Sequence, residues 1–415
     1  MSLTTATRPA TADAVVTTVQ VGDSSTGVVI SPDGLRAYIT NQSSNSVSVI
    51  NTATNTVTST VPVGKEPYAV AISPDGLRAY VTNLRSNSVS VINTATNTVT
   101  STVPVGKDPA GVAISPSGLR AYITNATSRS VSVIDTATNT VTGTVAVGID
   151  PAGVAISPDG LRAYVANFTE IGNGPGTVSV IDTATNTVIA TIPVGRLPYK
   201  VAITADGAHA YITNPGSDSV SVIDTATNTV TATVPVSASP SGVAISPSDN
   251  YVYVTGQGND SISVINMATN TVTATVPVSA SPLGVAVSPD GAHAYITHDT
   301  RPGTVSVIAF DRAPTLTGAP TVGVVGQPYH HAFTVTGQPA VTVAVTVGAL
   351  PDGLTLTEAG VLSGTPTKAG SFTFTVTASN GIGTAAPLKD VTVEVTDTTP
   401  ITPPSSGSLG PIFGS

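Results

Sequence analysis

Short apolar runs alternate with turn-forming residues along most of the chain, and one stretch shows the pattern clearly. An apolar run at residues 70–72 is followed by Ser-Pro-Asp-Gly at 73–76 and by Tyr-Val-Thr-Asn at 80–83. Two further runs occupy residues 89–92 and 99–105. Runs this short, rich in β-branched residues and bounded by turn residues, predict β-strands. The Pro-Asp-Gly turn predicts a hairpin, so the stretch predicts a four-stranded antiparallel meander.

This pattern occurs seven times in the chain, and its last copy lacks the fourth run. Its tyrosine returns after 42 residues in five of six steps and after 47 in the other, so the fourth copy carries a five-residue insertion. The seven tyrosines are Tyr38, Tyr80, Tyr122, Tyr164, Tyr211, Tyr253 and Tyr295. A period in the forties with four strands per repeat predicts one propeller blade, and blades packed face to face explain why both strand faces are apolar. We therefore predict an all-β fold with a seven-bladed β-propeller at residues 13–312.

The two ends of the repeat array complement each other. The seventh copy stops after its third strand at residues 305–308, whereas residues 15–21 form a fourth strand without a preceding blade. Pairing of these two strands would close the ring and leave no open edge. We predict that the N-terminal strand completes the last blade, preceded by a disordered leader at residues 1–12.

The repeat ends near Arg312, and a different all-β pattern follows at residues 313–397. The last segment, residues 398–415, is rich in Pro, Ser and Gly and is expected to be a linker or tail. Strands of the second pattern are expected near residues 321–325, 331–336, 372–378 and 391–395.

Alternation along a strand places Tyr80 and Thr82 on one face of the second strand, with Val81 and Asn83 on the other. Neighbouring blades would cover both faces. We therefore interpret the repeated tetrapeptide as inter-blade packing that ends in a turn-forming Asn.

Composition narrows the possible functions. The net charge of −9 opposes attraction to phosphate backbones, so nucleic acid is not a favoured partner. The chain has no cysteine and no long apolar run, which excludes disulfides, thiolate metal sites and a membrane-spanning helix.

Convergence of His209, His293 and His298 on one metal is not expected, because they lie in different blades or on different faces. Neither a catalytic serine motif nor a nucleotide-binding glycine motif is found, and no cofactor is predicted.

The repeated Tyr-[Ile/Val]-Thr-Asn motif, with Ser-Pro-Asp-Gly before it and Asp-Thr-Ala-Thr-Asn-Thr after it, resembles the YVTN family of β-propeller repeat proteins. Leu-Pro-Asp-Gly-Leu-Thr-Leu at residues 350–356 and Gly-Val-Leu-Ser-Gly-Thr-Pro at 360–366 are similar to the Ig-like (cadherin-like) domains of bacterial surface proteins. These resemblances imply a seven-bladed propeller followed by an Ig-like β-sandwich, in a protein of the cell surface. Related propellers also occur in lactonases and quinoprotein dehydrogenases, so the family implies no single chemistry.

Candidate ligand-binding residues gather on one end of the predicted propeller. The loops that join strand two to strand three, and strand four to the next blade, share one end of the meander, which we name the loop face. A funnel lined with mixed charge and tyrosines is the expected place for a ligand, although a passive solvated rim is an alternative. The candidates are Lys65, Tyr68, Lys107, Asp108, Asp150, Phe168, Glu170, Arg196, Tyr199 and Lys200, with Glu66 as a further carboxylate.

The opposite face repeats a cation two residues before the motif tyrosine. It is Arg36, Arg78, Arg120 and Arg162 in the first four copies. One interpretation is a ring that binds an anionic polymer, because guanidinium groups pair carboxylates and phosphates. The other is a set of salt bridges to the Asp of each Ser-Pro-Asp-Gly turn, since a repeat propagates residues whether or not each is used.

Three functions are compatible with these observations. The first is a non-enzymatic, monomeric interaction or adhesion module, extracellular or attached to the cell surface, that binds a protein or polysaccharide through the loop face. The second is a lactonase-like or sugar-processing hydrolase, for which Glu66, Asp108, Asp150, Arg196 and Lys200 are the candidates. The third is a structural repeat spacer, favoured by the similarity of the first blades.

Overall fold

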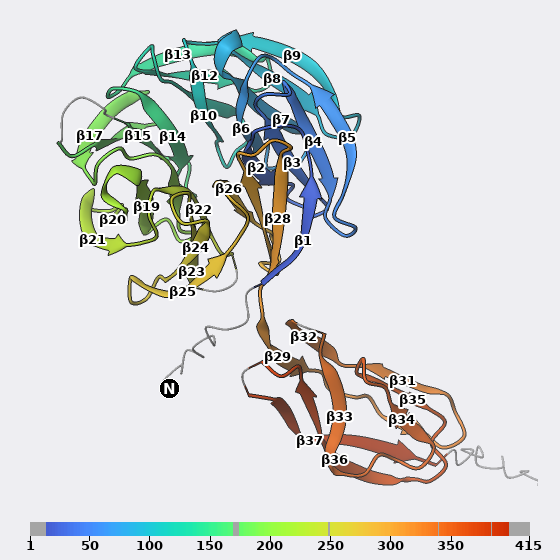
Figure 1. Cartoon of the computed structure of the whole chain (residues 1–415). Helices are drawn as coiled ribbons and strands as arrows, with labels where there is room; N and C mark the ends of the chain where they lie inside the picture. Colours follow the sequence, from blue (N-terminus) through green and yellow to red (C-terminus); the bar gives the residue numbers. More distant parts are fainter. Residues whose placement is uncertain (1–13, 169–173, 248–249, 339, 383, 398–415) are drawn as a thin grey trace, which may run out of the picture. The chain divides into compact units, whose positions relative to one another are not determined.

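The computed structural model describes residues 14–168, 174–247, 250–338, 340–382 and 384–397. The chain divides into two compact units between Phe310 and Asp311, and each unit is described by itself (Figure 1). The first unit is a ring of seven four-stranded antiparallel sheets, which is the predicted seven-bladed propeller. Blades one to six comprise β2–β5, β6–β9, β10–β13, β14–β17, β18–β21 and β22–β25 in turn, and blade seven comprises β26–β28 with β1.

Every blade orders its strands from the centre of the ring outwards. The innermost strands are β2 (Ser25–Ile30), β6 (Pro67–Ile72), β10 (Pro109–Ile114), β14 (Pro151–Ile156), β18 (Val201–Ile203), β22 (Pro240–Ile245) and β26 (Pro282–Val287). The second strands are β3 (Arg36–Asn41), β7 (Arg78–Asn83), β11 (Arg120–Asn125), β15 (Arg162–Asn167), β19 (His209–Asn214), β23 (Tyr251–Gly256) and β27 (His293–His298).

The third strands are β4 (Ser46–Asn51), β8 (Ser88–Asn93), β12 (Ser130–Asp135), β16 (Thr177–Asp182), β20 (Ser219–Asp224), β24 (Ser261–Asn266) and β28 (Thr304–Ala309). The outermost strands are β5 (Thr56–Pro62), β9 (Thr98–Pro104), β13 (Thr140–Ala146), β17 (Thr187–Pro193), β21 (Thr229–Pro235), β25 (Thr271–Pro277) and β1 (Ala14–Gln20). Two single-turn 3₁₀ helices, η1 (Leu84–Ser86) and η2 (Pro215–Ser217), lie between second and third strands.

The ring is closed by the N-terminal strand, as predicted. Strand β1 pairs antiparallel with β28, from Ala14 opposite Ala309 to Gln20 opposite Thr304. Val19 is buried and packs into the same apolar cluster as Val305 and Val307. The edge of β28 is therefore covered by a segment from the other end of the ring.

The motif tyrosines form the inter-blade core. All seven are at most 1% exposed, and most of their hydroxyls reach the turn between strands three and four of the following blade. Tyr80 Oη, for example, lies 3.3 Å from Asn139 Oδ1, and Tyr295 Oη lies 2.8 Å from Asn55 Oδ1. This confirms the interpretation of the motif as inter-blade packing.

The repeated arginines differ from the predicted salt bridges. Arg120 Nη1 donates a hydrogen bond to the carbonyl oxygen of Thr183 at 2.6 Å, in the turn of the next blade. The other three arginines make the same contact to Thr94, Thr136 and Thr225. Where the turn has an Asp, that residue instead accepts hydrogen bonds within its own hairpin, as Asp159 does from Ser157 Oγ and the Leu161 amide. Each guanidinium thus links two neighbouring blades and does not pair within its own hairpin.

The last residue of the motif also differs from prediction. Asn83 is fully buried in extended strand β7 and forms no turn. Its Nδ2 donates to Ser90 Oγ at 3.0 Å on the adjacent strand. A Cβ on Gly64 would lie 2.6 Å from the Asn83 Cγ, so the amide packs where the glycine leaves space. Short polar side chains often form turns, but here inter-strand bonding and close packing decide the conformation.

The second unit contains nine strands in three sheets within its described residues. Strands β30, β37, β36 and β33 form one sheet, β31, β35 and β34 a second, and β29 with β32 a third. Their bounds are β29 (Arg312–Thr317), β30 (Gly323–Val324), β31 (Tyr329–Ala332), β32 (Thr334–Gln338), β33 (Thr342–Gly348), β34 (Leu354–Leu356), β35 (Val361–Gly364), β36 (Gly370–Ser379) and β37 (Ala386–Thr396).

The core of this unit lies between the sheets, where Leu362, Val376 and Val393 are fully buried. The strand expected at residues 331–336 is divided, because Phe333 leaves the ladder between β31 and β32 and turns into this core. None of the helices in the described part of the chain is long and apolar enough to cross a membrane.

Candidate functional site

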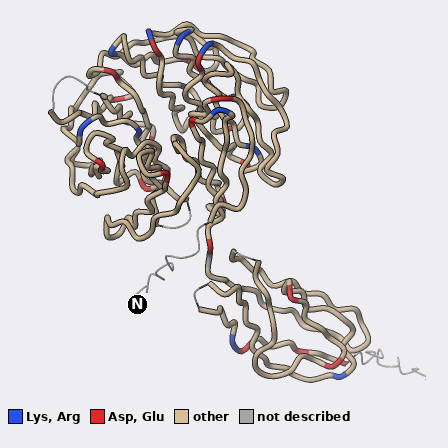
Figure 2. Tube along the Cα trace, in the orientation of Figure 1, with Lys and Arg blue, Asp and Glu red and all other residues tan. Residues whose placement is uncertain are grey.

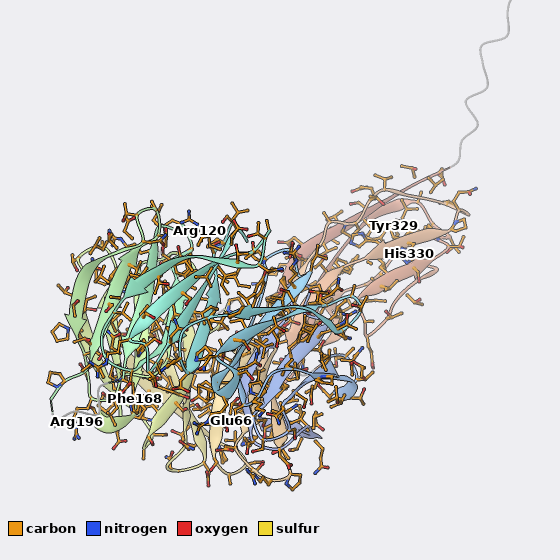
Figure 3. All side chains as sticks on the ribbon, turned by 90° about the horizontal axis from the view of Figure 1, so that it is seen from above. Glu66, Arg120, Phe168, Arg196, Tyr329 and His330 are labelled. Carbon is orange, nitrogen blue, oxygen red and sulfur yellow. The ribbon has the colours of Figure 1, made fainter. Side chains whose placement is uncertain are left out.

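The two sets of loops assigned to the loop face do meet there. The first amide after the second strand donates to a carbonyl in the loop that enters the same blade, as Leu84 does to Glu66 and Phe168 does to Asp150, each at 3.0 Å. Figure 3 views the propeller from its side and shows Glu66, Phe168 and Arg196 at one face, with Arg120 at the other. Because every blade uses this connection, the rim of the loop face is built by the repeat itself.

A cavity of about 170 Å³ lies on the axis of the ring. Each of the seven blades lines it with residues at or just before its innermost strand, and the lining includes a valine from every blade. These valines are Val28, Val70, Val112, Val154, Val201, Val243 and Val285. The channel wall is thus apolar side chain and strand backbone for most of its circumference.

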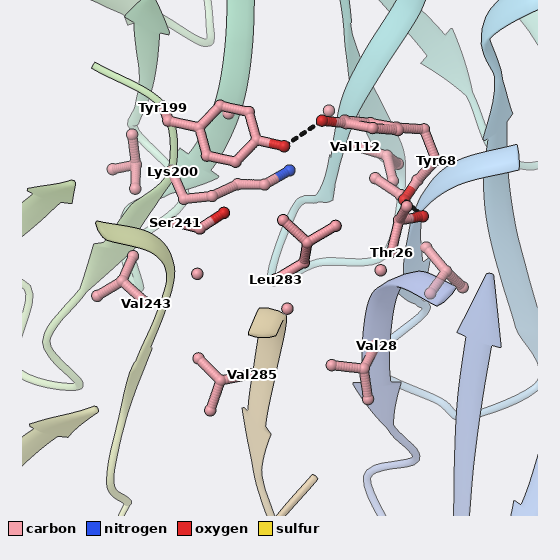
Figure 4. A pocket seen from close by; sticks show the side chains of 18 of the residues that line it. Thr26, Val28, Tyr68, Val112, Tyr199, Lys200, Ser241, Val243, Leu283 and Val285 are labelled. Atoms are coloured by element: carbon pink, nitrogen blue, oxygen red, sulfur yellow. Dashed lines mark hydrogen bonds between the residues drawn. The ribbon is translucent and has the colours of Figure 1, made fainter. Parts of the chain in front are cut away.

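Lys200 breaks the repeat at the channel wall. The residue before the channel valine is glycine in five blades and Ala69 in blade two. A Cβ on Gly153 would lie 2.5 Å from the carbonyl oxygen of Tyr199, which shows how closely neighbouring blades approach here. Blade five departs from this pattern, since its innermost strand is shortened to three residues and Lys200, just before that strand, has the longest side chain among the seven equivalent residues. The Lys200 amine points towards the centre of the channel (Figure 4).

Two tyrosines face the amine. The hydroxyls of Tyr68, on β6, and Tyr199, just before β18, form a hydrogen bond across the channel. The Lys200 Nζ lies 5.3 Å from the centroid of the Tyr68 ring and 4.9 Å from that of Tyr199. Both distances are in the range of cation–π attraction. The equivalent residues in the other blades are small or aliphatic, so this trio is particular to blades two and five.

The electrostatics of the trio follow from burial. Desolvation lowers the pKa of Lys200 to about 8, because the channel is a poorer solvent for an ammonium than water. Burial also raises the pKa of Tyr199 well above its ordinary value, and that of Tyr68 in the same direction. No carboxylate is among the described residues that line the cavity, and Lys200 forms no ion pair in the described part of the chain. The amine therefore has aromatic faces near it but no counter-charge.

The junction between blades four and five differs from the other junctions. At six junctions a motif threonine accepts a hydrogen bond from an inner-strand amide of its own blade and donates to a carbonyl of the next blade. Thr124 Oγ1 does this with the Gly111 amide at 2.6 Å and the Ala152 carbonyl at 2.7 Å. Blade four has Ala166 at this position, so the carbonyl of Tyr199 lacks the threonine contact. The same blade carries the insertion, whose first residue, Phe168, packs edge-on at 6.2 Å from the Tyr199 ring.

The structure brings together four of the predicted ligand-binding residues, namely Tyr68, Phe168, Tyr199 and Lys200. The others lie on the rim. The side chains of Lys65, Lys107 and Arg196 are exposed. The backbone amide of each of these residues donates a hydrogen bond to a serine hydroxyl of the adjoining loop. Asp108 Oδ2 accepts a hydrogen bond from Thr127, and Asp150 lies at the corresponding loop position of blade four. Glu170 falls outside the described residues.

Sequence reasoning missed a groove on the rim, where the two ends of the ring meet. This open hollow of about 1230 Å³ is lined by Asp23, Glu66, Arg85, Asp299 and Arg301 among others. Arg85 Nε lies 3.4 Å from Glu66 Oε2, and Arg301 donates to Ser43 Oγ at 2.8 Å. Charged residues are sparse on the propeller and lie in its loops or at the ends of its strands (Figure 2). The loop after His298 departs from the repeat in sequence, and that departure was the available signal.

Metal binding has no site among the described residues, since no group of three His, Asp or Glu side chains could hold an ion there. His298 is buried, with Nε2 2.8 Å from Ser306 Oγ and Nδ1 3.1 Å from the Ala280 carbonyl. Burial lowers its pKa. This histidine takes the structural place of the motif Asn in blade seven.

Comparisons with known proteins give two family matches. Residues 111–281 match the "Choice-of-anchor I domain", and residues 312–402 match the "Putative Ig domain". Among solved structures, a chain of the hydrazine synthase of Kuenenia stuttgartiensis is similar, with a TM-score of 0.66 and 26% identity over 69% of this chain and 96% of that chain. No curated protein matches the chain in sequence. The matches support a propeller-type surface domain followed by an Ig-like domain, and membership of the YVTN family stays a prediction.

Proposed function

We propose that the protein is a surface-associated binding module, in which the loop face of the propeller binds a protein or polysaccharide at the cell surface. The two family matches indicate surface association. The observation that carries the proposal is that four departures from the repeat gather at one place, apart from those in blades two, six and seven. Ala166, Phe168, Tyr199 and Lys200 all lie at the junction of blades four and five, beside the loop-face mouth of the channel.

This clustering separates a binding module from a repeat spacer. In a spacer, the blades carry no individual task, and substitutions would be scattered over the ring. Here the changes combine aromatic side chains and a cation at one end of the channel, and a concave site with a few converging polar groups is the default place for a ligand. The exposed Lys65, Lys107 and Arg196 on the same face supply charges that can orient a partner.

A lactonase-like hydrolase has less support. Catalysis of this kind needs an acid or base within hydrogen-bond reach of the reacting group. Glu66, Asp108 and Asp150 belong to the rim loops, and none of them lines the channel with Lys200. Turnover of a lactone panel that is lost in Asp108→Ala would favour the hydrolase instead.

Binding of the labelled full-length chain to intact cells tests the proposed function. The loop-face variant Lys65→Glu/Lys107→Glu should bind severalfold more weakly than the wild type. The matched control is Lys368→Glu/Lys389→Glu, which makes the same change of charge at two exposed lysines of the Ig-like unit. Protease treatment of the cells would identify a protein partner, and periodate treatment a polysaccharide. Equal loss in both variants, or binding that neither variant weakens, would contradict a loop-face partner.

A further inference from the structure

The Lys200 amine has no counter-charge among the described residues that line the channel, and nothing in the fold requires a cation there. Five of the seven blades place glycine at this position, so the ring closes without a side chain there. An ammonium loses hydration in such a cavity, and the two tyrosine rings return only part of that energy. Solvent reaches the trio, because Tyr68, Tyr199 and Lys200 are each only partly buried.

We propose that the channel binds a small aliphatic monocarboxylate, with the carboxylate at the Lys200 ammonium and the hydrocarbon part against the channel valines. The anion supplies the counter-charge that the described lining lacks. Tyr68 and Tyr199 each carry a hydroxyl beside the amine, and exchange of their mutual hydrogen bond for one to the ligand would place a donor at a carboxylate oxygen. The rest of the wall consists of the seven valines, glycines, Ala69 and Leu283, with hydroxyls from Thr26 and Ser241, and its aliphatic side chains suit a short alkyl chain.

The size and charge of the cavity select this ligand class. A cavity of roughly 150 Å³ accommodates a benzene-sized molecule, and the channel, at about 170 Å³, is similar. A phosphate or dicarboxylate would bring two negative charges to one lysine and leave one of them buried without a partner, which is costly. A neutral alcohol would leave the ammonium without its counter-charge. A monocarboxylate with a short tail satisfies both the amine and the valines.

This site is separate from the surface partner of the proposed function, because the ligand is a small molecule and its pocket lies inside the ring. A carboxylate at the end of a partner chain has the same chemistry, and the two sources are distinguished by testing purified protein with a free acid. No cell-surface partner is needed in that experiment. Failure of one proposal therefore leaves the other standing.

Binding of an anion should be coupled to proton uptake. The titratable groups that face the amine are Tyr68 and Tyr199, and the charge of Asp299 acts on both phenols. A carboxylate beside Lys200 favours the charged amine and raises its pKa from about 8 towards the ordinary value. Binding near pH 8 should take up a fraction of a proton, and affinity should fall as the pH rises above 8.

The test is calorimetric titration of the full-length chain with butyrate at pH 8, in two buffers of different ionisation enthalpy. We expect saturable binding with proton uptake, and a loss of at least about tenfold in affinity in Lys200→Met, which keeps the hydrophobic stem. Lys200→Gly, which restores the residue of the other blades, should lose binding as well. The control Lys65→Met removes an exposed lysine from the rim and should bind as the wild type does.

Three results would overturn the proposal. The first is no binding of butyrate by the wild type at millimolar concentrations. The second is binding that Lys200→Met and Lys200→Gly retain while their unfolding temperatures remain that of a folded propeller. The third is inorganic phosphate or butanol binding as tightly as butyrate, since either would show that the site does not select one negative charge together with an apolar tail.

Discussion

Ser237 packs against Gly256 so closely that a Cβ on Gly256 would lie 2.5 Å from the Ser237 Cβ. The preceding blade has the reverse arrangement, in which Gly195 leaves space for Asn214. The Ser237 hydroxyl lies 2.9 Å from Ser263 Oγ, and in blade five the Asn214 amide makes the equivalent contact to Ser221 at 3.0 Å. Blade six therefore has the larger residue at position 237 and the glycine at position 256, the reverse of the Gly195–Asn214 pair, and it keeps a hydrogen bond to the serine of its third strand.

This exchange predicts strong coupling between the two positions. Gly256→Asn alone should destabilise the propeller by about 1–3 kcal/mol, because the new side chain overlaps Ser237. Adding Ser237→Gly should recover most of that loss and recreate the pair found in blade five. We expect a coupling free energy of about 0.5–3 kcal/mol in a double-mutant cycle. Guanidinium unfolding followed by circular dichroism measures it, and simple additivity of the two changes would contradict the packing argument.

The threonine bridge between blades predicts opposite effects at two junctions. Thr124→Val keeps the shape of the side chain but leaves the Gly111 amide and the Ala152 carbonyl without the bridging hydroxyl. It should cost about 1–3 kcal/mol, the penalty for buried polar groups that lose a partner. Ala166→Thr should instead add the missing bridge at the junction of blades four and five, and stabilise by about 0.5–1.5 kcal/mol. Destabilisation by Ala166→Thr would mean that the Tyr199–Lys200 backbone needs the smaller residue.

The sequence predicted the blades well because their determinants are local. Apolar runs and Ser-Pro-Asp-Gly turns act within one repeat, and Gly76 has a positive φ of 73°, which glycine adopts without steric cost. Closure by the N-terminal strand could be inferred by counting strands. Contacts between blades were less accessible, since Arg162 finds its partner 63 residues away, whereas local charge pairing suggested Asp159 of its own turn. The buried state of Asn83 likewise depends on Gly64, which lies outside its own strand.

The candidate site was predicted in part. The structure gathers Tyr68, Tyr199 and Lys200 at the loop-face end of the channel, whereas the sequence grouped Lys200 with rim charges such as Lys65, and ligand binding there stays a prediction. The place of Lys200 in the channel depends on the residue at which the innermost strand of blade five begins, and the repeat period alone does not define that residue. Comparison of equivalent positions in the seven repeats would have shown a lysine among glycines, and that is the signal within the sequence that locates the channel site.

Removal of strand β1 should destabilise the propeller severely. Deletion of residues 1–20 exposes the edge of β28 and removes Val19 from the cluster that contains Val305 and Val307. The ring would lose its closure as well as a buried valine, which alone is worth about 1.5–3 kcal/mol. We expect a clear fall in unfolding temperature and a tendency to associate through the open edge. Deletion of residues 1–12, which leaves β1 whole, is the control, and equal unfolding temperatures for the two deletions would contradict closure by β1.

The depressed pKa of Lys200 predicts that this residue opposes folding at neutral pH and ceases to do so in alkali. The folded pKa is about 8 and the ordinary value is 10.5, so the unfolded chain binds more protons between these limits. Stability linked to this amine therefore rises with pH across that window, and Lys200→Met should be more stable than the wild type at pH 7. The difference should be a few kcal/mol, at about 1.4 kcal/mol for each pH unit by which a pKa moves. It should shrink towards pH 9.5, before ionisation of the unfolded tyrosines near pH 10 adds its own effect.

Urea unfolding of both proteins at several pH values measures the difference, with Lys65→Met as the exposed control. A difference that does not change with pH would mean that the amine is solvated in the folded protein, and that the channel imposes no desolvation on it.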